Sequence, residues 1–179
     1  MHSKTNNFIY WGLYVIVWLI FVGLSIEAGG LLVNFFFSLY NPEMVHNLYQ
    51  KLDLSEMYNR NQLAFYGIYS FIITNAVLKA VMFYIVIRLM HTMKLSQPFT
   101  RFVSAQILRI SYFTLVIGLL SYIARQWTNN LVHRGYTTTG LNQFLDDSQA
   151  FIVMGAVIYI IATIFKKGIE LQEENDLTV

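Results

Sequence analysis

The chain has 179 residues, enough for one domain, and 56% of them are apolar whereas only 12% are charged. Its mean hydropathy is +0.49. A water-soluble domain of this size could not bury so much apolar surface, so the composition indicates a protein whose solvent is lipid. The absence of cysteine excludes disulfides, thiolate metal sites and cysteine nucleophiles. A net charge of +2 is too small to indicate direct binding of nucleic acid.

Four apolar segments are long enough to cross a bilayer as helices. They cover about residues 8–37, 63–90, 102–124 and 148–168. The first is longer than the h-region of a signal peptide, and no small-residue cleavage site follows it, so we expect it to remain as a helix. The sequence therefore predicts an all-α integral membrane protein in which residues 1–179 form a single domain, an antiparallel bundle of four transmembrane helices.

Four spans place both termini on one side of the membrane. Lysine and arginine residues in short segments beside spans favour the cytoplasm, which predicts a cytoplasmic turn over 91–101, an acidic cytoplasmic tail over 169–179 and outer loops over 41–62 and 126–147. In the first outer loop Met44, Leu48 and Leu52, with Val45 beside them, recur at helical spacing. This pattern predicts a short helix lying on the outer membrane surface. The basic residues expected inside are Lys4, Arg88, Lys94, Arg101, Lys166 and Lys167, against Lys51, Arg60, Arg125 and Arg134 outside.

Polar residues inside the predicted spans are costly in lipid, so each needs a partner or a role. Glu27, Asn75, Lys79 and Arg109 could together form a polar interior that binds an ion, an anionic lipid or a small ligand. Alternatively, Lys79 and Arg109 extend to the membrane surface while Glu27 pairs with one of them. This second interpretation is favoured for Arg109, and both stay open for Lys79. We expect an ion pair between Glu27 and Lys79 to join the first two helices.

The sequence contains no H-E-x-x-H, G-x-S-x-G or P-loop motif, and its four histidines are scattered. We therefore expect a protein without catalytic activity, cofactor or metal.

The densest charge lies in the tail, with Glu170, Glu173, Glu174 and Asp176 close together. Glu170 and Glu174 are like charges one helical turn apart, and acids near a helix C-terminus oppose the helix dipole. Either the end of the helix is simply solvated, or something basic receives it. The predicted turn that carries Lys94 and Arg101 is one candidate receiver, and a cytoplasmic partner protein is another.

The ending G-I-E-L-Q-E-E-N-D-L-T-V over 168–179 resembles the C-terminal signature of the YoaS-like family. These are uncharacterised bacterial four-helix membrane proteins that form a domain of unknown function. Further matches are Q-P-F-T at 97–100, I-L-R-I-S-Y at 107–112 and I-G-L-L-S at 117–121. The resemblance covers essentially the whole chain, although the outer loops are longer here. It implies a bacterial cytoplasmic membrane protein in which 169–177 is one motif and Pro98, Phe99 and Arg109 are a second. Members are often encoded beside a small helix-turn-helix regulator, which implies such a protein as partner.

Two functions from different classes follow. The first is a non-enzymatic regulatory protein that docks a partner, such as a helix-turn-helix regulator, on its cytoplasmic face. The second is a small carrier or a lipid- or ion-binding protein that uses Glu27, Asn75, Lys79 and Arg109. A homo-oligomer or a subunit of a larger membrane assembly is a third expectation. The residues expected to form the docking face are Glu170, Glu173, Glu174, Asp176, Lys94, Arg101, Pro98 and Phe99.

Overall fold

The computed structural model describes residues 2–93, 99–138, 140–145 and 147–176. Four long helices dominate it, and each contains a segment long and apolar enough to cross a membrane. The prediction of an all-α fold with four membrane-compatible helices is confirmed. In chain order the helices are α1 (His2–Tyr40), α3 (Gln62–Thr92), α4 (Arg101–His133) and α6 (Ser148–Asp176).

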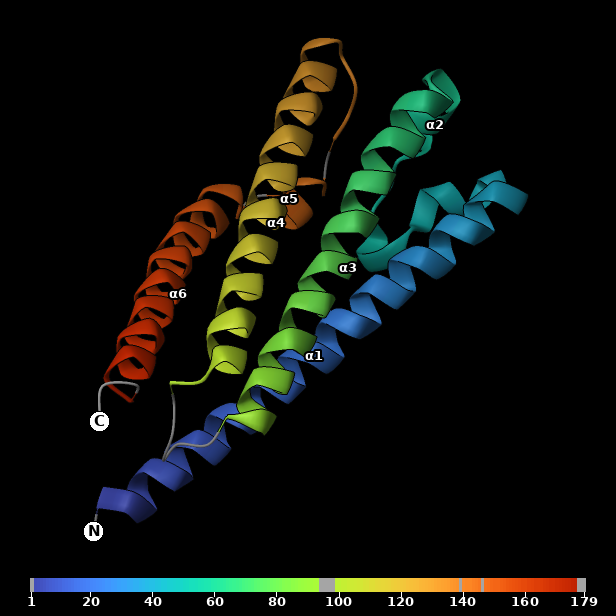
Figure 1. The fold of residues 1–179 in the computed structure, drawn as a ribbon. Helices are drawn as coiled ribbons and strands as arrows, with labels where there is room; N and C mark the ends of the chain where they lie inside the picture. The colour runs from blue at the N-terminus through green and yellow to red at the C-terminus, as the bar shows by residue number, and fades with distance from the viewer. Residues whose placement is uncertain (1, 94–98, 139, 146, 177–179) are drawn as a thin grey trace.

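The four helices stand in an antiparallel row (Figure 1). Helix α1 packs on α3, α3 packs on α4, and α4 and α6 share the most extensive interface. Helices α1 and α6 form the two edges of this row, so the bundle is open. The chain begins and ends near the same end of the row, which we call the terminal end; the connections before α3 and after α4 form the loop end.

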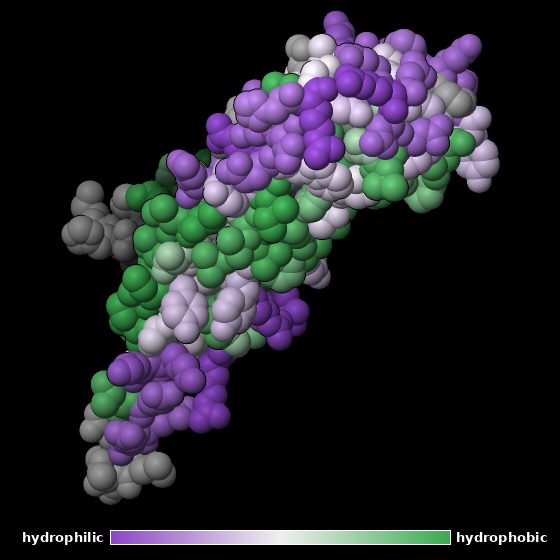
Figure 2. All heavy atoms as spheres, turned by 90° about the horizontal axis from the view of Figure 1, so that it is seen from above, coloured by the Kyte–Doolittle hydropathy of each residue, from purple (hydrophilic) through white to green (hydrophobic). Residues whose placement is uncertain are grey.

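A belt of apolar side chains separates two hydrophilic ends of the molecule (Figure 2). Each helix contains a most apolar stretch of 18 residues. The buried share of this stretch is 11% in α1 and 17% in α6, against 28% in α3 and 33% in α4. The edge helices therefore expose most of their apolar surface. Soluble monomers rarely carry an apolar patch of this extent, so lipid is the solvent that fits it.

Polar side chains define where α3 and α4 begin. The Asn61 Oδ1 atom accepts hydrogen bonds from the backbone N–H groups of Leu63 and Ala64, and Thr100 Oγ1 accepts one from Val103. Each cap satisfies donors that the first helical turn leaves without an internal partner.

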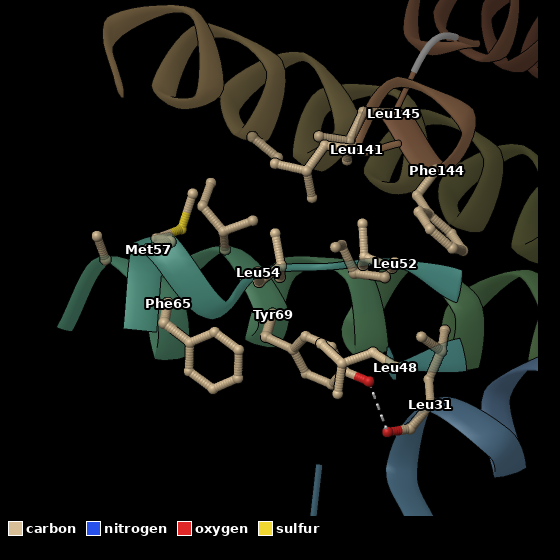
Figure 3. Close-up of a cluster of buried hydrophobic side chains, with 14 of the residues drawn as sticks. Leu31, Leu48, Leu52, Leu54, Met57, Phe65, Tyr69, Leu141, Phe144 and Leu145 are labelled. Atoms are coloured by element: carbon tan, nitrogen blue, oxygen red, sulfur yellow. Dashed lines mark hydrogen bonds between the residues drawn. The ribbon is translucent and has the colours of Figure 1, made fainter. Parts of the chain in front are cut away.

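The first loop forms a buried core at the loop end. It contains two short 3₁₀ helices, η1 (Pro42–Asn47) and η2 (Tyr49–Lys51), and the helix α2 (Ser55–Arg60). Its apolar side chains pack against α3 and against the second loop, which contains the short helix α5 (Asn142–Leu145) (Figure 3). The side chains that meet in this core include Val45, Leu48, Leu52, Leu54, Met57, Phe65, Tyr69, Leu141, Phe144 and Leu145.

The structure corrects the expectation of a membrane-surface helix built on Met44, Leu48 and Leu52, with Val45 beside them. Val45, Leu48 and Leu52 are buried inside the protein, and the α-helix of this loop begins only at Ser55; the side chain of Met44 lies outside the described part of the structure. The physical reason is that the second loop covers them, which gives their apolar area a protein partner in place of the membrane.

Polar contacts also join the two loops. The Arg60 guanidinium donates to the carbonyl oxygens of Arg134 and Gly135 at 3.2 and 3.1 Å and lies 4.4 Å from the Tyr136 ring centroid. Thr137 Oγ1 donates to the Glu56 carboxylate. The loop end is thus one folded unit built from both loops.

Candidate functional site

The seam between α4 and α6 positions everything at the terminal end. A Cβ atom on Gly118 would lie 2.8 Å from the backbone nitrogen of Ile152, and one on Gly155 would lie 2.9 Å from that of Leu115. The two backbones therefore approach closely, as small residues allow in lipid. Ser111 Oγ adds a hydrogen bond to the Gly155 carbonyl oxygen at 3.0 Å. This seam fixes the register of α6 on α4.

In that register the first residue of α4 faces the last turns of α6. Arg101 Nε donates to Glu173 Oε1 and Arg101 Nη2 to Glu173 Oε2, both at 2.7 Å. This two-pronged geometry is the most directional form of an arginine–carboxylate pair. Nearby, the rings of Phe99 and Phe165 lie with centroids 4.9 Å apart. Together these contacts hold the C-terminal turns of α6 against the start of α4.

The sequence left open whether the acidic tail is solvated or received by a basic group, and two of its acids lie beside basic side chains. Glu173 is paired with Arg101, and Lys166 Nζ lies 4.0 Å from Glu170 Oε1. Of the two receivers expected for the tail, the structure shows the basic turn, through Arg101. Lys94 and Pro98 lie outside the described residues, and of Asp176 only its backbone, at the end of α6, is described.

A groove of about 440 Å³ lies between α4 and α6 at the terminal end. We call it the terminal groove. Its charged residues come from both helices, whereas its floor is apolar. The polar residues that line it are Arg101, Ser104, Lys166, Glu170 and Glu173.

The four polar residues expected inside the membrane do not form one network. Asn75 is buried, and its Nδ2 atom donates to Ser121 Oγ. Lys79 Nζ lies 5.4 Å from the ring centroid of Phe151 on α6. Arg109 is exposed and Glu27 half-buried. Within the described ranges no ion pair or hydrogen bond joins Glu27 or Arg109 to the other two.

The expected ion pair between Glu27 and Lys79 is therefore not formed. Lys79 turns its ammonium toward α6, whereas α1 lies against another face of α3. Spacing along one helix shows which residues share a face, but it does not show which neighbouring helix that face meets.

Sequence reasoning missed two features of the molecule. The first is a set of buried oxygen atoms, Asn75 Oδ1, Gln106 Oε1 and Ser148 Oγ, that accept no hydrogen bond within the described protein. The second is a polar pocket of about 320 Å³ at the loop end, lined by residues that include Asp53, Glu56 and Thr137. No local pattern signals this pocket, because it exists only where two loops distant in the sequence meet.

Comparison with known proteins gives a family but no activity. No curated protein and no solved structure matches the chain. The family described as "Protein of unknown function (DUF2975)" matches residues 47–179, which include α3, α4 and α6. This match confirms the domain of unknown function that the resemblance implied, while the YoaS-like label itself stays a resemblance. Since the match covers well over half of its residues, the chain belongs to the DUF2975 family.

Proposed function

We propose that this protein is a non-enzymatic regulator in the cytoplasmic membrane of a bacterium. In this proposal its loop end is coupled through α4 to a docking face at the terminal end. The observation that carries the proposal is the continuity of α4, a single helix from Arg101 to His133. Its beginning holds Glu173, and its last turns place Leu131 in the core of the loop end. A displacement of that core would therefore act on the helix that holds the tail.

The docking face includes Phe99, Arg101, Glu170, Glu173 and the remaining acidic residues of the tail. Because Arg101 and the aromatic pair hold α6 in place, the carboxylates of Glu170 and Glu173 are presented on an ordered helix, which lowers the entropic cost of binding. Their charge suits a partner with a basic surface. A helix-turn-helix regulator meets this requirement, since proteins that bind DNA carry basic patches. We propose such a regulator as the partner and the cytoplasm as the location of both termini.

The test is co-purification of the full-length protein in detergent with the product of the neighbouring gene, which the family resemblance predicts to be a helix-turn-helix regulator. Glu170→Lys reverses an exposed charge of the docking face, and Glu43→Lys makes the same change at the loop end, where Glu43 is also exposed. We expect Glu170→Lys to lower recovery about tenfold at low salt, which corresponds to ~1.4 kcal/mol. Glu43→Lys should leave it unchanged. Equal recovery by both variants and the native chain would contradict the proposal.

Removal of residues 175–179 is a second test that leaves the fold intact. It keeps buried Ile169 and the pair between Arg101 and Glu173, whereas a deletion from residue 169 would remove both. Loss of partner recovery after this short truncation would support docking through the end of the tail, and undiminished recovery would remove residues 175–179 from the docking face.

A second candidate function is supported by the polar groups inside the membrane. Asn75 Oδ1 is buried without a partner, and one turn away the ammonium of Lys79 has an aromatic ring but no carboxylate within 4.0 Å in the described part of the chain. Unpartnered groups of this kind in lipid favour a bound ion, lipid or small molecule. Thermal unfolding of Lys79→Met with candidate ligands tests this function. Unchanged stability and no ligand-dependent shift in the native protein would exclude it.

A further inference from the structure

We infer that the terminal groove binds the headgroup of a phospholipid that carries a primary amine, such as phosphatidylethanolamine. This inference does not rest on partner docking, because it concerns the groove at the membrane border and the lipid around the protein. Its grounds are the order of charges along the groove, its apolar floor and its position.

The charges in the groove follow the order of groups in such a lipid. The apolar stretch of α6 ends at Phe165, so Lys166 stands at the membrane border. Glu170 lies one turn farther out, and the pair between Glu173 and Arg101 closes the far end. From the membrane outward, the groove thus presents a cation and then carboxylates. A zwitterionic phospholipid presents a phosphate and then an ammonium, so every charge meets its opposite.

The individual donors and acceptors fit this placement. Lys166 is only loosely paired with Glu170, at 4.0 Å, and an ammonium offers three donors to a phosphate. The hydroxyl of Ser104 lines the same groove. Both oxygens of Glu173 already accept from Arg101, so Glu170 is the acceptor for the lipid's ammonium.

The apolar floor suits the remainder of the lipid. Ala105 and Leu108 of α4 and Ile169 of α6 form it, and Leu108 lies within the membrane segment of α4. A glycerol backbone and the beginning of an acyl chain would therefore continue along the seam of the two helices into the hydrocarbon region. The groove volume of about 440 Å³ falls within the usual range for small-ligand sites.

The residues that line the groove also favour one type of phospholipid headgroup over others. A quaternary ammonium cannot donate hydrogen bonds and is usually held against aromatic rings. Among the described residues that line the groove, none is aromatic. An anionic glycerol headgroup would place hydroxyls rather than a cation beside Glu170 and Glu173. Of these headgroups, only one with a primary ammonium can donate charge-assisted hydrogen bonds to the Glu170 carboxylate.

The experiment measures lipid bound to the full-length, delipidated protein in detergent by native mass spectrometry. The probes are dioleoyl phosphatidylethanolamine, phosphatidylcholine and phosphatidylglycerol at equal concentration. We expect about tenfold tighter binding of phosphatidylethanolamine than of phosphatidylcholine, the size of one charge-assisted hydrogen bond. Glu170→Gln should remove this preference, and Lys166→Gln should weaken the binding of all three lipids.

Lys167→Gln is the matched control, since Lys167 neighbours Lys166 but does not line the groove. It should bind like the native chain. Equal binding of phosphatidylethanolamine and phosphatidylcholine to the native protein would overturn the inference, and so would a preference that survives Glu170→Gln. Leu108→Trp, which fills the floor without changing charge, should also reduce binding. Partner recovery in the co-purification is a separate measurement, so either proposal can fail alone.

Discussion

Single glycines set how closely α4 and α6 approach each other. The backbone of α6 occupies the space that a side chain on Gly118 would need, and α4 does the same for Gly155. By contrast, Gly12 and Gly23 of α1 have no atom within 4 Å of an added Cβ. The same residue type therefore has a packing role in one helix and none in another.

We predict that Gly118→Ala destabilises the protein by about 2 kcal/mol, because backbone atoms cannot yield to the added methyl group. Thermal unfolding in detergent measures this change. Gly23→Ala is the control and should leave stability equal or slightly higher, since alanine is the better helix former. A Gly118→Ala variant as stable as the native chain would show that the seam is looser than described.

The hydrogen bond between Asn75 and Ser121 should couple α3 to α4. We predict a coupling energy of about 0.6–1.7 kcal/mol, as measured for polar pairs between membrane helices. A double-mutant cycle of Asn75→Ala and Ser121→Ala, read by unfolding in detergent, gives this value. Strictly additive effects would mean that the two side chains do not interact.

At the loop end, the pKa of Asp53 is lowered because Ser55 donates hydrogen bonds to its carboxylate from the hydroxyl and the backbone N–H, with His46 adding a smaller effect. A lowered pKa stabilises the fold above the ordinary value of about 3.9, and this contribution disappears as the pH falls through the lowered value. We predict that Ser55→Ala moves the pKa of Asp53 upward in a carboxyl NMR titration. A native midpoint at or above about 3.9 would contradict the hydrogen bonds.

Among the elements, the first loop departs most from its sequence pattern. Spacing of apolar residues predicts which of them share a face, and Leu48 and Leu52 do act together. It cannot predict that Leu141 and Leu145, some ninety residues later, cover that face. The spans were predictable because their signal is local and long, whereas this core depends on contact between two loops.

We predict that Leu52→Ala lowers the free energy of unfolding by about 2–5 kcal/mol, as expected for a leucine buried in protein. Leu19→Ala in α1 is the control, because Leu19 is exposed on the apolar belt and loses only contacts with lipid. Unfolding of both variants in the same detergent provides the comparison. Similar small effects would indicate that the loop lies on the membrane surface, as the sequence pattern first suggested.

For the whole molecule, the sequence predicts four helices long and apolar enough to cross a membrane, and the family of unknown function. It also names the turn that carries Arg101 as one candidate receiver of the acidic tail, without specifying that Glu173 is the residue bound. The predicted ion pair between Glu27 and Lys79 does not form. The order of helices along the chain does not show which face of α3 packs against α1. Only three-dimensional contact reveals the open row, the seam that sets the register and the groove that results.

The most direct test of the central claim asks whether the loop end and the terminal end lie on opposite sides of a membrane. The chain has no cysteine, so single cysteines can be introduced at exposed Glu43 and Leu171 and labelled with a membrane-impermeant maleimide. We predict that Glu43→Cys reacts in intact bacteria and that Leu171→Cys reacts only after the membrane is disrupted. Labelling of both positions from the same side would contradict the four-span account.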